Sequence, residues 1–249
     1  MVILPPGVHR VPGEAFAVDP AAPWLRYYPD LDQGSQAWLD ARCGLVTASE
    51  VKLLLTPTLK VANNDKVRAH LWELLAQRIT HYVEPRYISD DMLRGQEDEI
   101  FARAAYEEAY GTMGSMGFIT NSEWGFTLGY SPDGLIGARG LWECKSRSQK
   151  YQAATIAQNA VPDEYMMQLQ TGLLVTGRDW IDFTTYCGGM PMLTLRVYPD
   201  DAVQAAILDA VAQFETQLRD LRGQYEATLA ELGTRAIPTE RRVMEEITI

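Results

Sequence analysis

Two acidic residues and a lysine stand close together in the stretch LGYSPDGLIGARGLWECKS. Asp133 follows a proline, Glu143 comes ten positions later, and Lys145 follows two positions after that. Two ionised carboxylates held side by side repel each other unless a cation lies between them. Mg²⁺ prefers oxygen ligands, commonly one or two carboxylates with water and phosphate oxygens, and it can activate a bound water. The stretch therefore predicts a site for Mg²⁺, with Mn²⁺ as the alternative ion.

The strand-like segment LWECKS must turn Glu143 and Lys145 toward the same side. Side chains alternate across a strand, so these two residues share one face while Trp142 and Cys144 share the other. We expect the tryptophan and the cysteine to face the core, and Glu143 and Lys145 to point into a cleft. On that face Lys145 can orient or deprotonate a metal-bound water and screen the charge that develops on a phosphate.

A tight hairpin is needed to bring Asp133 to Glu143. Pro132 keeps the chain extended immediately before Asp133, and the residues ARG form the turn between the two strands. The backbone carbonyl of Cys144 is then a further candidate oxygen ligand for the same ion. An alternative stays open, in which Glu143 and Lys145 form a surface pair on an edge strand and Asp133 is only a turn residue after proline.

The hairpin lies within a chain whose hydrophobic periodicity alternates between helix and strand. The predicted helices cover residues 36–42, 67–82, 90–110, 151–160, 163–175 and 201–232. Thr47 and Glu50 have the spacing of a capping box, which predicts one more helix in TASEVKLLL. The predicted strands cover residues 117–120, 124–130, 134–137, 141–146, 180–187 and 192–199. This order of helices and strands indicates a mixed α/β domain.

Length and composition indicate one domain with short appendages. The chain has 249 residues, of which 47% are hydrophobic, enough for a sizeable core. Residues 1–34 are rich in proline, glycine and aspartate and predict an irregular N-terminal arm. We expect a single domain over residues 35–233, including the long last helix, and a C-terminal tail over residues 234–249.

Charge and cysteine content narrow the classes of function. The net charge of −11 argues against binding nucleic acid through a generally basic surface, although it allows a basic groove on an acidic body. The three cysteines lie far apart, which argues against a disulfide framework or a four-cysteine metal centre. The sequence has neither a secretory leader nor an apolar run of membrane-spanning length, so it predicts a soluble cytoplasmic protein without a membrane partner.

Four motifs in the sequence resemble those of one known family. SPDG, followed by a strand with E-x-K, is similar to the PD-(D/E)-x-K nuclease core. The remaining motifs of lambda exonuclease and the YqaJ-like viral recombinases resemble three further stretches: QAWLDARCGLVTASEV, RGQEDEIFARAAYEEAYG and YMMQLQTGLLVTGRDWIDFTTY. The four occur in family order between Trp38 and Tyr186. The resemblance implies an α/β nuclease core, a central mixed β-sheet flanked by helices.

The resemblance also implies roles for single residues. Asp133 and Glu143 would be metal ligands, and Lys145 the catalytic lysine. Glu99 matches the helical glutamate of the family and would reach a metal directly or through water. Gln168 would lie beside the lysine and position water or phosphate. Glu97 competes with Glu99 for the helical position, and Glu99 is preferred because it keeps the spacing from the preceding glycine. Gln168 as an ordinary hydrogen-bonding core residue is the alternative.

Three further residues are implied to bind the 5′-terminal phosphate of DNA. Arg42 lies in the W-x-x-x-R motif and would contact that phosphate, with Ser49 assisting. Ser131 precedes the aspartate motif and would touch a phosphate as well. The structural alternatives are that Arg42 only covers a helix packed by Trp38 and that Ser49 only begins a helix.

The activity implied by the resemblance is a metal-dependent 5′→3′ exonuclease. It would degrade one strand of linear double-stranded DNA and leave 3′ overhangs for phage-type homologous recombination with a single-strand annealing protein. A phage or prophage protein in the cytoplasm of a bacterial host is the implied setting. The alternatives are an endonuclease built on the same core and a non-catalytic clamp for DNA ends.

Basic residues in the motif segments offer a way for an acidic protein to hold DNA. The family forms ring-shaped homotrimers, and a positive lumen inside an acidic exterior would retain DNA. The residues that could line such a channel are Arg42, Lys52, Arg94, Arg103, Lys145, Arg147 and Lys150.

Overall fold

The strands form two four-stranded sheets in the computed structural model, which describes residues 22–85 and 89–241. In the first sheet the order is β1 (Leu25–Tyr28), β3 (Phe118–Asn121), β4 (Leu128–Tyr130) and β2 (Val46–Thr47). In the second sheet the order is β5 (Gly134–Ile136), β6 (Gly140–Ser146), β7 (Trp180–Tyr186) and β8 (Leu193–Val197). Each sheet is mixed, because β2 pairs with β4 and β6 pairs with β7 in parallel. The mixed α/β fold class is therefore confirmed, with its strands divided between two sheets.

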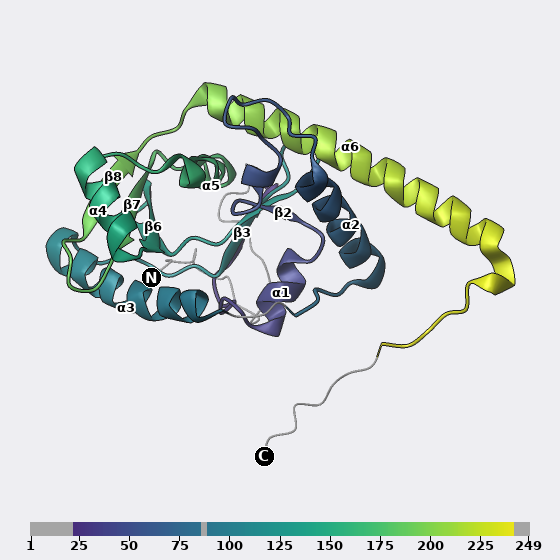
Figure 1. The fold of residues 1–249 in the computed structure, drawn as a ribbon, viewed down its shortest axis with the longest axis horizontal. Helices are drawn as coiled ribbons and strands as arrows, with labels where there is room; N and C mark the ends of the chain where they lie inside the picture. The colour runs from purple at the N-terminus through teal and green to yellow at the C-terminus, as the bar shows by residue number, and fades with distance from the viewer. Residues whose placement is uncertain (1–21, 86–88, 242–249) are drawn as a thin grey trace, which may run out of the picture.

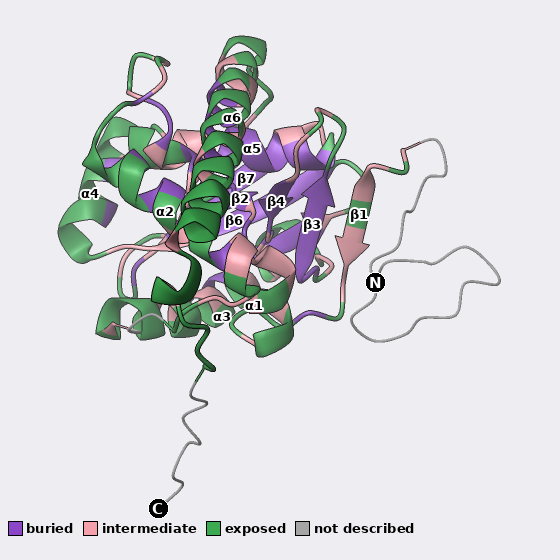
Figure 2. Ribbon diagram, turned by 90° about the vertical axis from the view of Figure 1, so that its right-hand side faces the viewer, coloured by how far each residue is buried: buried purple, intermediate pink, exposed green. Residues whose placement is uncertain are grey.

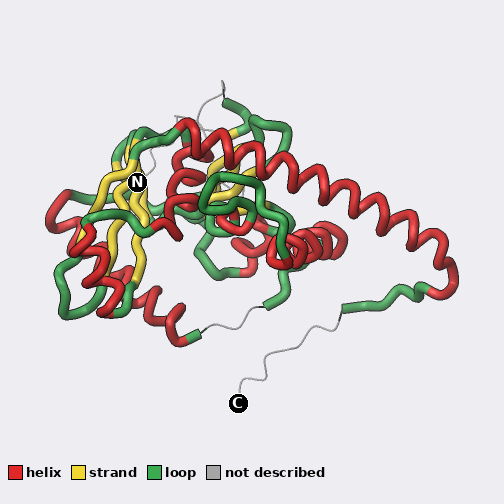
Figure 3. The backbone as a smooth tube through the Cα atoms, turned by 45° about the horizontal axis from the view of Figure 1, so that its top comes forward, coloured by secondary structure: helices red, strands yellow, loops and turns green. Residues whose placement is uncertain are grey.

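Helices surround both sheets, as Figures 1 and 3 show. They are α1 (Gln36–Arg42), α2 (Asp65–Thr80), α3 (Asp90–Tyr110), α4 (Gln149–Gln158), α5 (Asp163–Thr176) and α6 (Asp201–Leu232), with short 3₁₀ turns η1 (Val51–Leu53) and η2 (Gly233–Arg235). The first half of α6 packs on the body of the molecule, and its second half runs out beyond it (Figure 1). None of the helices in the described part of the chain has the length and apolar character needed to span a bilayer.

Helix α5 is the central packing element. Its residues Leu169 and Leu173 are fully buried in the main core, where strands of both sheets are also buried (Figure 2). Gly172 is required there, because a Cβ atom at this position would lie 2.8 Å from the Tyr130 ring. The close approach brings α5 against β4, next to the turn that leads into the second sheet. The core therefore fixes α5 beside the segment that carries the acidic residues.

The strand predicted over residues 124–130 is confined to β4 at Leu128–Tyr130, and two further segments differ from the structure predicted for them. The irregular arm predicted over residues 1–34 is wrong for residues 25–28, which form β1 and pair antiparallel with β3. Residues 1–21 of the predicted arm lie outside the described residues. The helix predicted in TASEVKLLL is only the 3₁₀ turn η1. Glu50 does accept hydrogen bonds from the backbone N–H and hydroxyl of Thr47. The backbone of Thr47 nevertheless belongs to β2, because Ala48 N–H donates to Gly129 O and the parallel pairing with β4 outweighs the local capping signal.

A buried polar network ties α3 to the second sheet. The Tyr106 hydroxyl donates to Asp182 Oδ2 at 2.6 Å, and Arg196 donates to both carboxylate oxygens of Asp182 at 2.8 and 2.9 Å. Burial, followed by the hydrogen bond to Asp182, raises the pKa of Tyr106 above the ordinary tyrosine value of about 10. The folded protein therefore resists ionisation of this phenol more than the unfolded chain does.

We expect Tyr106 to make stability depend on pH in the alkaline range. Because the folded pKa is raised, its contribution is fully present below pH about 10 and is lost as pH rises toward the folded value. Urea unfolding of wild type and Tyr106→Phe between pH 8 and pH 11 checks this. The difference in unfolding free energy between the two proteins should shrink above pH about 10. A constant difference would contradict it.

Candidate active site

The β5–β6 hairpin places Asp133 beside Glu143. Gly134 pairs with Trp142 in the antiparallel register, so Asp133 lies opposite the start of the E-x-K segment. The backbone N–H of Cys144 donates to Asp133 Oδ2 at 2.8 Å. The Cys144 N–H thus fixes the Asp133 carboxylate against the strand that carries Glu143.

Glu143 is the most enclosed acidic group of this cluster, with 1% of its surface exposed. Its Oε2 accepts a hydrogen bond from the Tyr130 hydroxyl at 2.9 Å. Its Oε1 accepts from Lys145 Nζ at 2.6 Å and from Gln168 Nε2 at 2.5 Å. The three donors come from β4, β6 and α5, so both sheets and the central helix orient this carboxylate.

The expected division of β6 into a core face and a cleft face is only partly right. Trp142 and Cys144 are buried, as predicted, in a small cluster formed with α3. The opposite face is not open, because α5 and Tyr130 cover Glu143. The Lys145 side chain keeps 25% of its surface exposed. Both faces of β6 are therefore covered at Glu143, and Lys145 is the more exposed of these two side chains.

Glu99 on α3 is the third acidic group of the cluster. Burial, and then the negative charge of Glu143, raise the pKa of Glu99. Burial raises the pKa of Asp133 well above its ordinary value, and the charges of Glu143 and Glu99 raise it further. Burial alone would lower the pKa of Lys145, but Glu143 and Asp133 raise it by more, so its ammonium is held charged. Glu97 is exposed and has no part in this cluster, which supports the choice of Glu99.

The carboxylate oxygens of this cluster are the kind of ligand that a hard divalent cation such as Mg²⁺ prefers. Within residues 22–85 and 89–241, no three His, Cys, Asp or Glu side chains are close enough to hold a metal ion by themselves. Mg²⁺ does not require three, since it commonly takes one or two carboxylates and completes its shell with water and phosphate oxygens. Asp133 and Glu143 supply the carboxylates, and a cation would relieve the crowding of negative charge that raises the pKa of Asp133. The residues therefore fit such an ion, with Glu99 within electrostatic reach.

A cleft of about 650 Å³ opens beside Asp133 and Glu99. Arg103 lies in its wall and donates to the backbone carbonyls of Asp133 at 3.1 Å and Met113 at 3.2 Å. It also pairs with Glu107. Arg103 thereby fixes the backbone of Asp133 and is held within the wall, although the sequence had suggested it only as one of several channel residues.

Two of the three residues predicted to bind a 5′-phosphate lie together. Trp38 Nε1–H donates to Ser131 Oγ at 2.9 Å, and the Arg42 guanidinium lies 4.2 Å from the centre of the Trp38 ring. Arg42 also donates to Thr47 Oγ1 at 2.9 Å. Ser49 is exposed in the turn before η1, and its side chain forms no hydrogen bond with the described residues. Arg42 and Ser131 thus both contact Trp38, and within the described residues no side-chain hydrogen bond ties Ser49 to them.

Several residues that shape the site are not predicted from the sequence. Tyr130 donates to Glu143, and its only local signal is its place in LGY, two residues before the proline. Ser146 donates to Asp98 Oδ2 at 2.6 Å and so ties the end of β6 to α3. The Tyr165 ring centre lies 5.9 Å from Lys145 Nζ. Each contact joins residues from different helices or strands, so the local hydrophobic periodicity of the sequence does not predict it.

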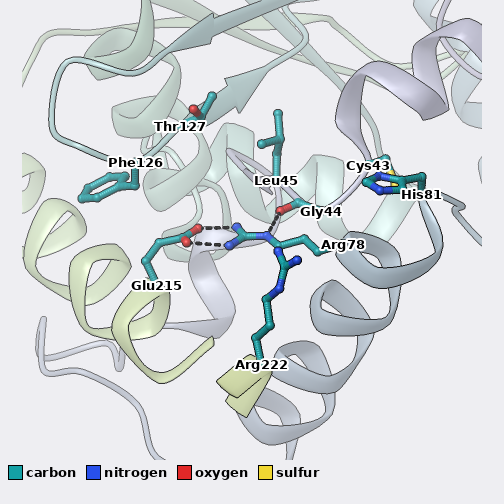
Figure 4. A pocket seen from close by; sticks show the side chains of 9 residues that line it. All are labelled: Cys43, Gly44, Leu45, Arg78, His81, Phe126, Thr127, Glu215 and Arg222. Carbon is teal, nitrogen blue, oxygen red and sulfur yellow. Dashed lines mark hydrogen bonds and ion pairs between the residues drawn. The ribbon is translucent and has the colours of Figure 1, made fainter. Parts of the chain in front are cut away.

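A second cavity, of about 420 Å³, has a different character (Figure 4). Arg78 donates to both carboxylate oxygens of Glu215, at 2.8 and 2.6 Å, and its Nε–H donates to Gly44 O at 2.8 Å. Gly44 has a φ of 72°, and a Cβ atom there would lie 2.6 Å from Arg78 Cγ. These contacts join α2, α6 and the turn after α1. These contacts hold three segments of the fold together. The cluster of acidic side chains lies instead at the cleft beside Asp133 and Glu99.

Comparison with known proteins agrees with the geometry. Residues 37–179 match the family model of the YqaJ-like viral recombinase domain. The crystal structure of LHK-Exo, an alkaline exonuclease from Laribacter hongkongensis, has 32% sequence identity and a TM-score of 0.72, and the match covers 80% of this chain and 100% of that one. Its complex with dAMP gives 32% identity and a TM-score of 0.71 over the same shares of the two chains.

A more distant structure shares the fold alone. The phage related exonuclease from Haemophilus somnus 129PT has 13% identity and a TM-score of 0.54, over 73% of this chain and 96% of that one. A search among curated proteins returned no match.

Proposed function

Since this chain belongs to the family of YqaJ-like viral recombinase domains, we propose that it is a metal-dependent 5′→3′ exonuclease of linear double-stranded DNA. The family and the similarity to LHK-Exo support a phage-type exonuclease that acts on DNA. The strand polarity, the 3′ overhangs and the requirement for Mg²⁺ or Mn²⁺ are part of the proposal. The observation that carries it is the contact of Glu143 with Lys145 at 2.6 Å, next to an Asp133 carboxylate fixed by the intervening residue Cys144.

The proposed reaction is hydrolysis of a phosphodiester bond. A divalent cation held by Asp133, Glu143 and the Cys144 carbonyl, with Glu99 in reach, would supply Lewis acidity and an activated water. Lys145 places a positive charge where negative charge develops on the scissile phosphate. Gln168 and Lys145 both donate to Glu143 Oε1, so Gln168 holds the glutamate and the lysine in one arrangement.

Selection of 5′ ends is assigned to the group around Trp38. Arg42 and Ser131 both contact this tryptophan, and Ser131 lies two residues before Asp133. A phosphate bound by Arg42 and Ser131 would therefore be near the metal ligands. Guanidinium groups bind phosphate through charge-assisted hydrogen bonds. Ser49 is retained as a weaker candidate, since it is exposed and nearby in sequence.

The test of this function is a Mg²⁺ time course on three substrates: linear duplex with 5′-phosphate ends, the same duplex with 5′-hydroxyl ends, and closed circular duplex. We expect loss of the 5′ strand from the linear substrates, faster from the phosphorylated one, and no cleavage of the circle. Cleavage of the circle would indicate an endonuclease. Binding to ends without nucleotide release would indicate a non-catalytic clamp.

Arg42→Gln is expected to remove the preference for phosphorylated ends. A hydrogen bond to a charged group contributes about 1.5–3 kcal/mol, which corresponds to a preference of about 10-fold to 150-fold. The rate on 5′-hydroxyl ends should change little, which separates this role from simple misfolding. Arg68→Gln, an exposed arginine on α2, is the matched control. An unchanged end preference in Arg42→Gln would remove its assigned role.

Three further parts of the proposal rest on family membership. They are a ring-shaped homotrimer, a single-strand annealing protein as partner, and action in the cytoplasm of a bacterial host. The domain boundaries at residues 35 and 233 also stay predictions. A mass measurement in solution tests the trimer directly.

A further inference from the structure

The turn from β6 into α4 carries the next positive charges along the chain from the proposed active site. Arg147 follows Lys145 by two residues, and Lys150 and Tyr151 lie in the first turn of α4. The Arg147 guanidinium lies 5.1 Å from the centre of the Tyr151 ring, and Lys150 Nζ lies 4.6 Å from it. Tyr151 is 49% exposed. An exposed ring is therefore flanked by two cations.

Other basic residues near the proposed active site already form hydrogen bonds or ion pairs within the protein. Arg103 donates to two backbone carbonyls in the cleft wall, and Arg94 pairs with Asp91 and contacts Ser146. Lys150, by contrast, is exposed and forms no ion pair with any residue that the structure describes. Lys150 thus offers a positive charge that no described residue pairs with.

Arg147 has one hydrogen-bonding edge in use and one without a partner. Its side chain is only 9% exposed, and Nη1 donates to both Glu164 Oε1 and the Tyr165 hydroxyl. Nε is buried, and among the described residues it has no partner. The edge formed by Nε and Nη2 is the one with which a guanidinium binds a phosphate through two parallel hydrogen bonds. A buried donor without a partner is costly, so a phosphate that gained access to this edge would satisfy Nε.

The start of α4 adds to the same site. The side chain of its N-cap residue Ser148 makes no capping hydrogen bond. Free backbone N–H groups at a helix N-terminus favour anions. Lys145 and Arg147 both face the Tyr165 ring, at 5.9 and 5.2 Å from its centre, so the two charges lie no farther apart than the sum of these distances, about 11 Å. With a rise of about 3.4 Å per nucleotide of a strand, this separation spans at most about three nucleotides.

We propose that Arg147, Lys150 and Tyr151 form a second phosphate site, which binds the DNA backbone within about three nucleotides of the scissile phosphate. This inference rests on the proposed nuclease function and specifies how its substrate is held. Arg147 and Lys150 contact backbone phosphates, and the exposed Tyr151 ring packs on a sugar or base of the same strand. Glu164 competes with a phosphate for Arg147, because its carboxylate accepts a hydrogen bond from Arg147 Nη1 at 2.7 Å. The Glu164 side chain is 59% exposed.

The test measures binding of a fluorescent 5′-phosphorylated linear duplex by anisotropy, with Ca²⁺ in place of Mg²⁺, between 50 and 200 mM salt. Each lost phosphate contact should lower the slope of log K against log salt by about 0.9. We therefore expect a slope lower by about one unit in Lys150→Gln and in Arg147→Gln. Glu164→Gln should bind more tightly, because it frees Arg147 from its carboxylate. Arg139→Gln is the matched control, since Arg139 is 78% exposed at the opposite end of β6.

The outcomes separate this site from the function on which it rests. If Lys150→Gln and Arg147→Gln bind with the wild-type slope while wild type degrades the duplex, the site is refuted and the nuclease function stands. If wild type neither binds nor degrades the duplex, both fail. Should Arg147→Gln lose its folded circular dichroism spectrum, Lys150→Gln decides alone, because Lys150 is exposed and has no ion pair within the described part of the chain.

Discussion

Replacing Asp133 by asparagine is expected to lower the rate of DNA hydrolysis by about 100-fold to 1,000-fold while raising the thermal unfolding midpoint of the metal-free protein. The first effect follows because a cation held by Asp133 and Glu143 would lose one of its two carboxylates, and removal of a single charge-stabilising group typically costs this much. The second effect follows from the crowding of acids around the same position.

The gain in stability has a specific structural cause. Burial raises the pKa of Asp133 well above its ordinary value, and the charges of Glu143 and Glu99 raise it further. An ionised carboxylate there is opposed by desolvation and by two like charges, and a neutral amide of the same shape removes both effects. The asparagine carbonyl can still accept the hydrogen bond from Cys144 N–H. Asp133→Asn should therefore gain stability and lose activity, a trade-off that is common at functional sites.

The measurement pairs single-turnover kinetics in Mg²⁺ with calorimetry in EDTA. Glu97→Gln is the matched control, because Glu97 is an exposed acid on α3 that lies outside the cluster. It should retain the wild-type rate and nearly the wild-type unfolding midpoint. Substantial activity in Asp133→Asn would overturn its assignment as a metal ligand. A lower midpoint would show that the aspartate stabilises the metal-free fold.

Replacing Lys145 by methionine is expected to reduce hydrolysis by about 100-fold to 1,000-fold as well. Methionine keeps most of the volume of the side chain and removes only the charge. The neighbouring carboxylates of Glu143 and Asp133 hold the lysine in its charged form, which suits a group that stabilises negative charge on a phosphate. A cationic role predicts that Lys145→Arg recovers part of the loss, because arginine keeps the charge with a different geometry.

Two controls make this prediction specific. Lys66→Met alters an exposed lysine at the start of α2 and should leave the rate unchanged. Duplex affinity in Ca²⁺ should fall far less than the rate in Lys145→Met, because a charge that acts mainly in the transition state contributes little to ground-state binding. An equal loss in affinity and in rate would assign Lys145 to binding alone.

Much of the fold could be predicted from local sequence patterns. The boundaries of α1, α3 and α6 agree with those expected. The signals that predict them are the hydrophobic periodicity of each helix and the polar residue at its start, and both can be read from neighbouring residues. The hairpin turn and the alternation along β6 are equally local. For this reason the sequence alone was sufficient to single out Asp133, Glu143 and Lys145, whose spacing is short and whose chemistry is explicit.

The parts of the fold that local patterns did not predict depend on pairing between β-strands that are distant in sequence. β1 became a strand only because Leu25 pairs with Asn121, and η1 remained a short turn because Thr47 pairs with Gly129. No local pattern encodes a partner that lies tens of residues away, and such a partner can override local propensity.

The donors around Glu143 illustrate the same limit within the site. Tyr130 and Gln168 meet this carboxylate because the close packing at Gly172 draws α5 onto β4. The sequence alone predicts which groups carry the chemistry. The tertiary structure alone decided which neighbours orient them and which nearby positive charges are paired within the described residues, because those depend on packing between distant segments.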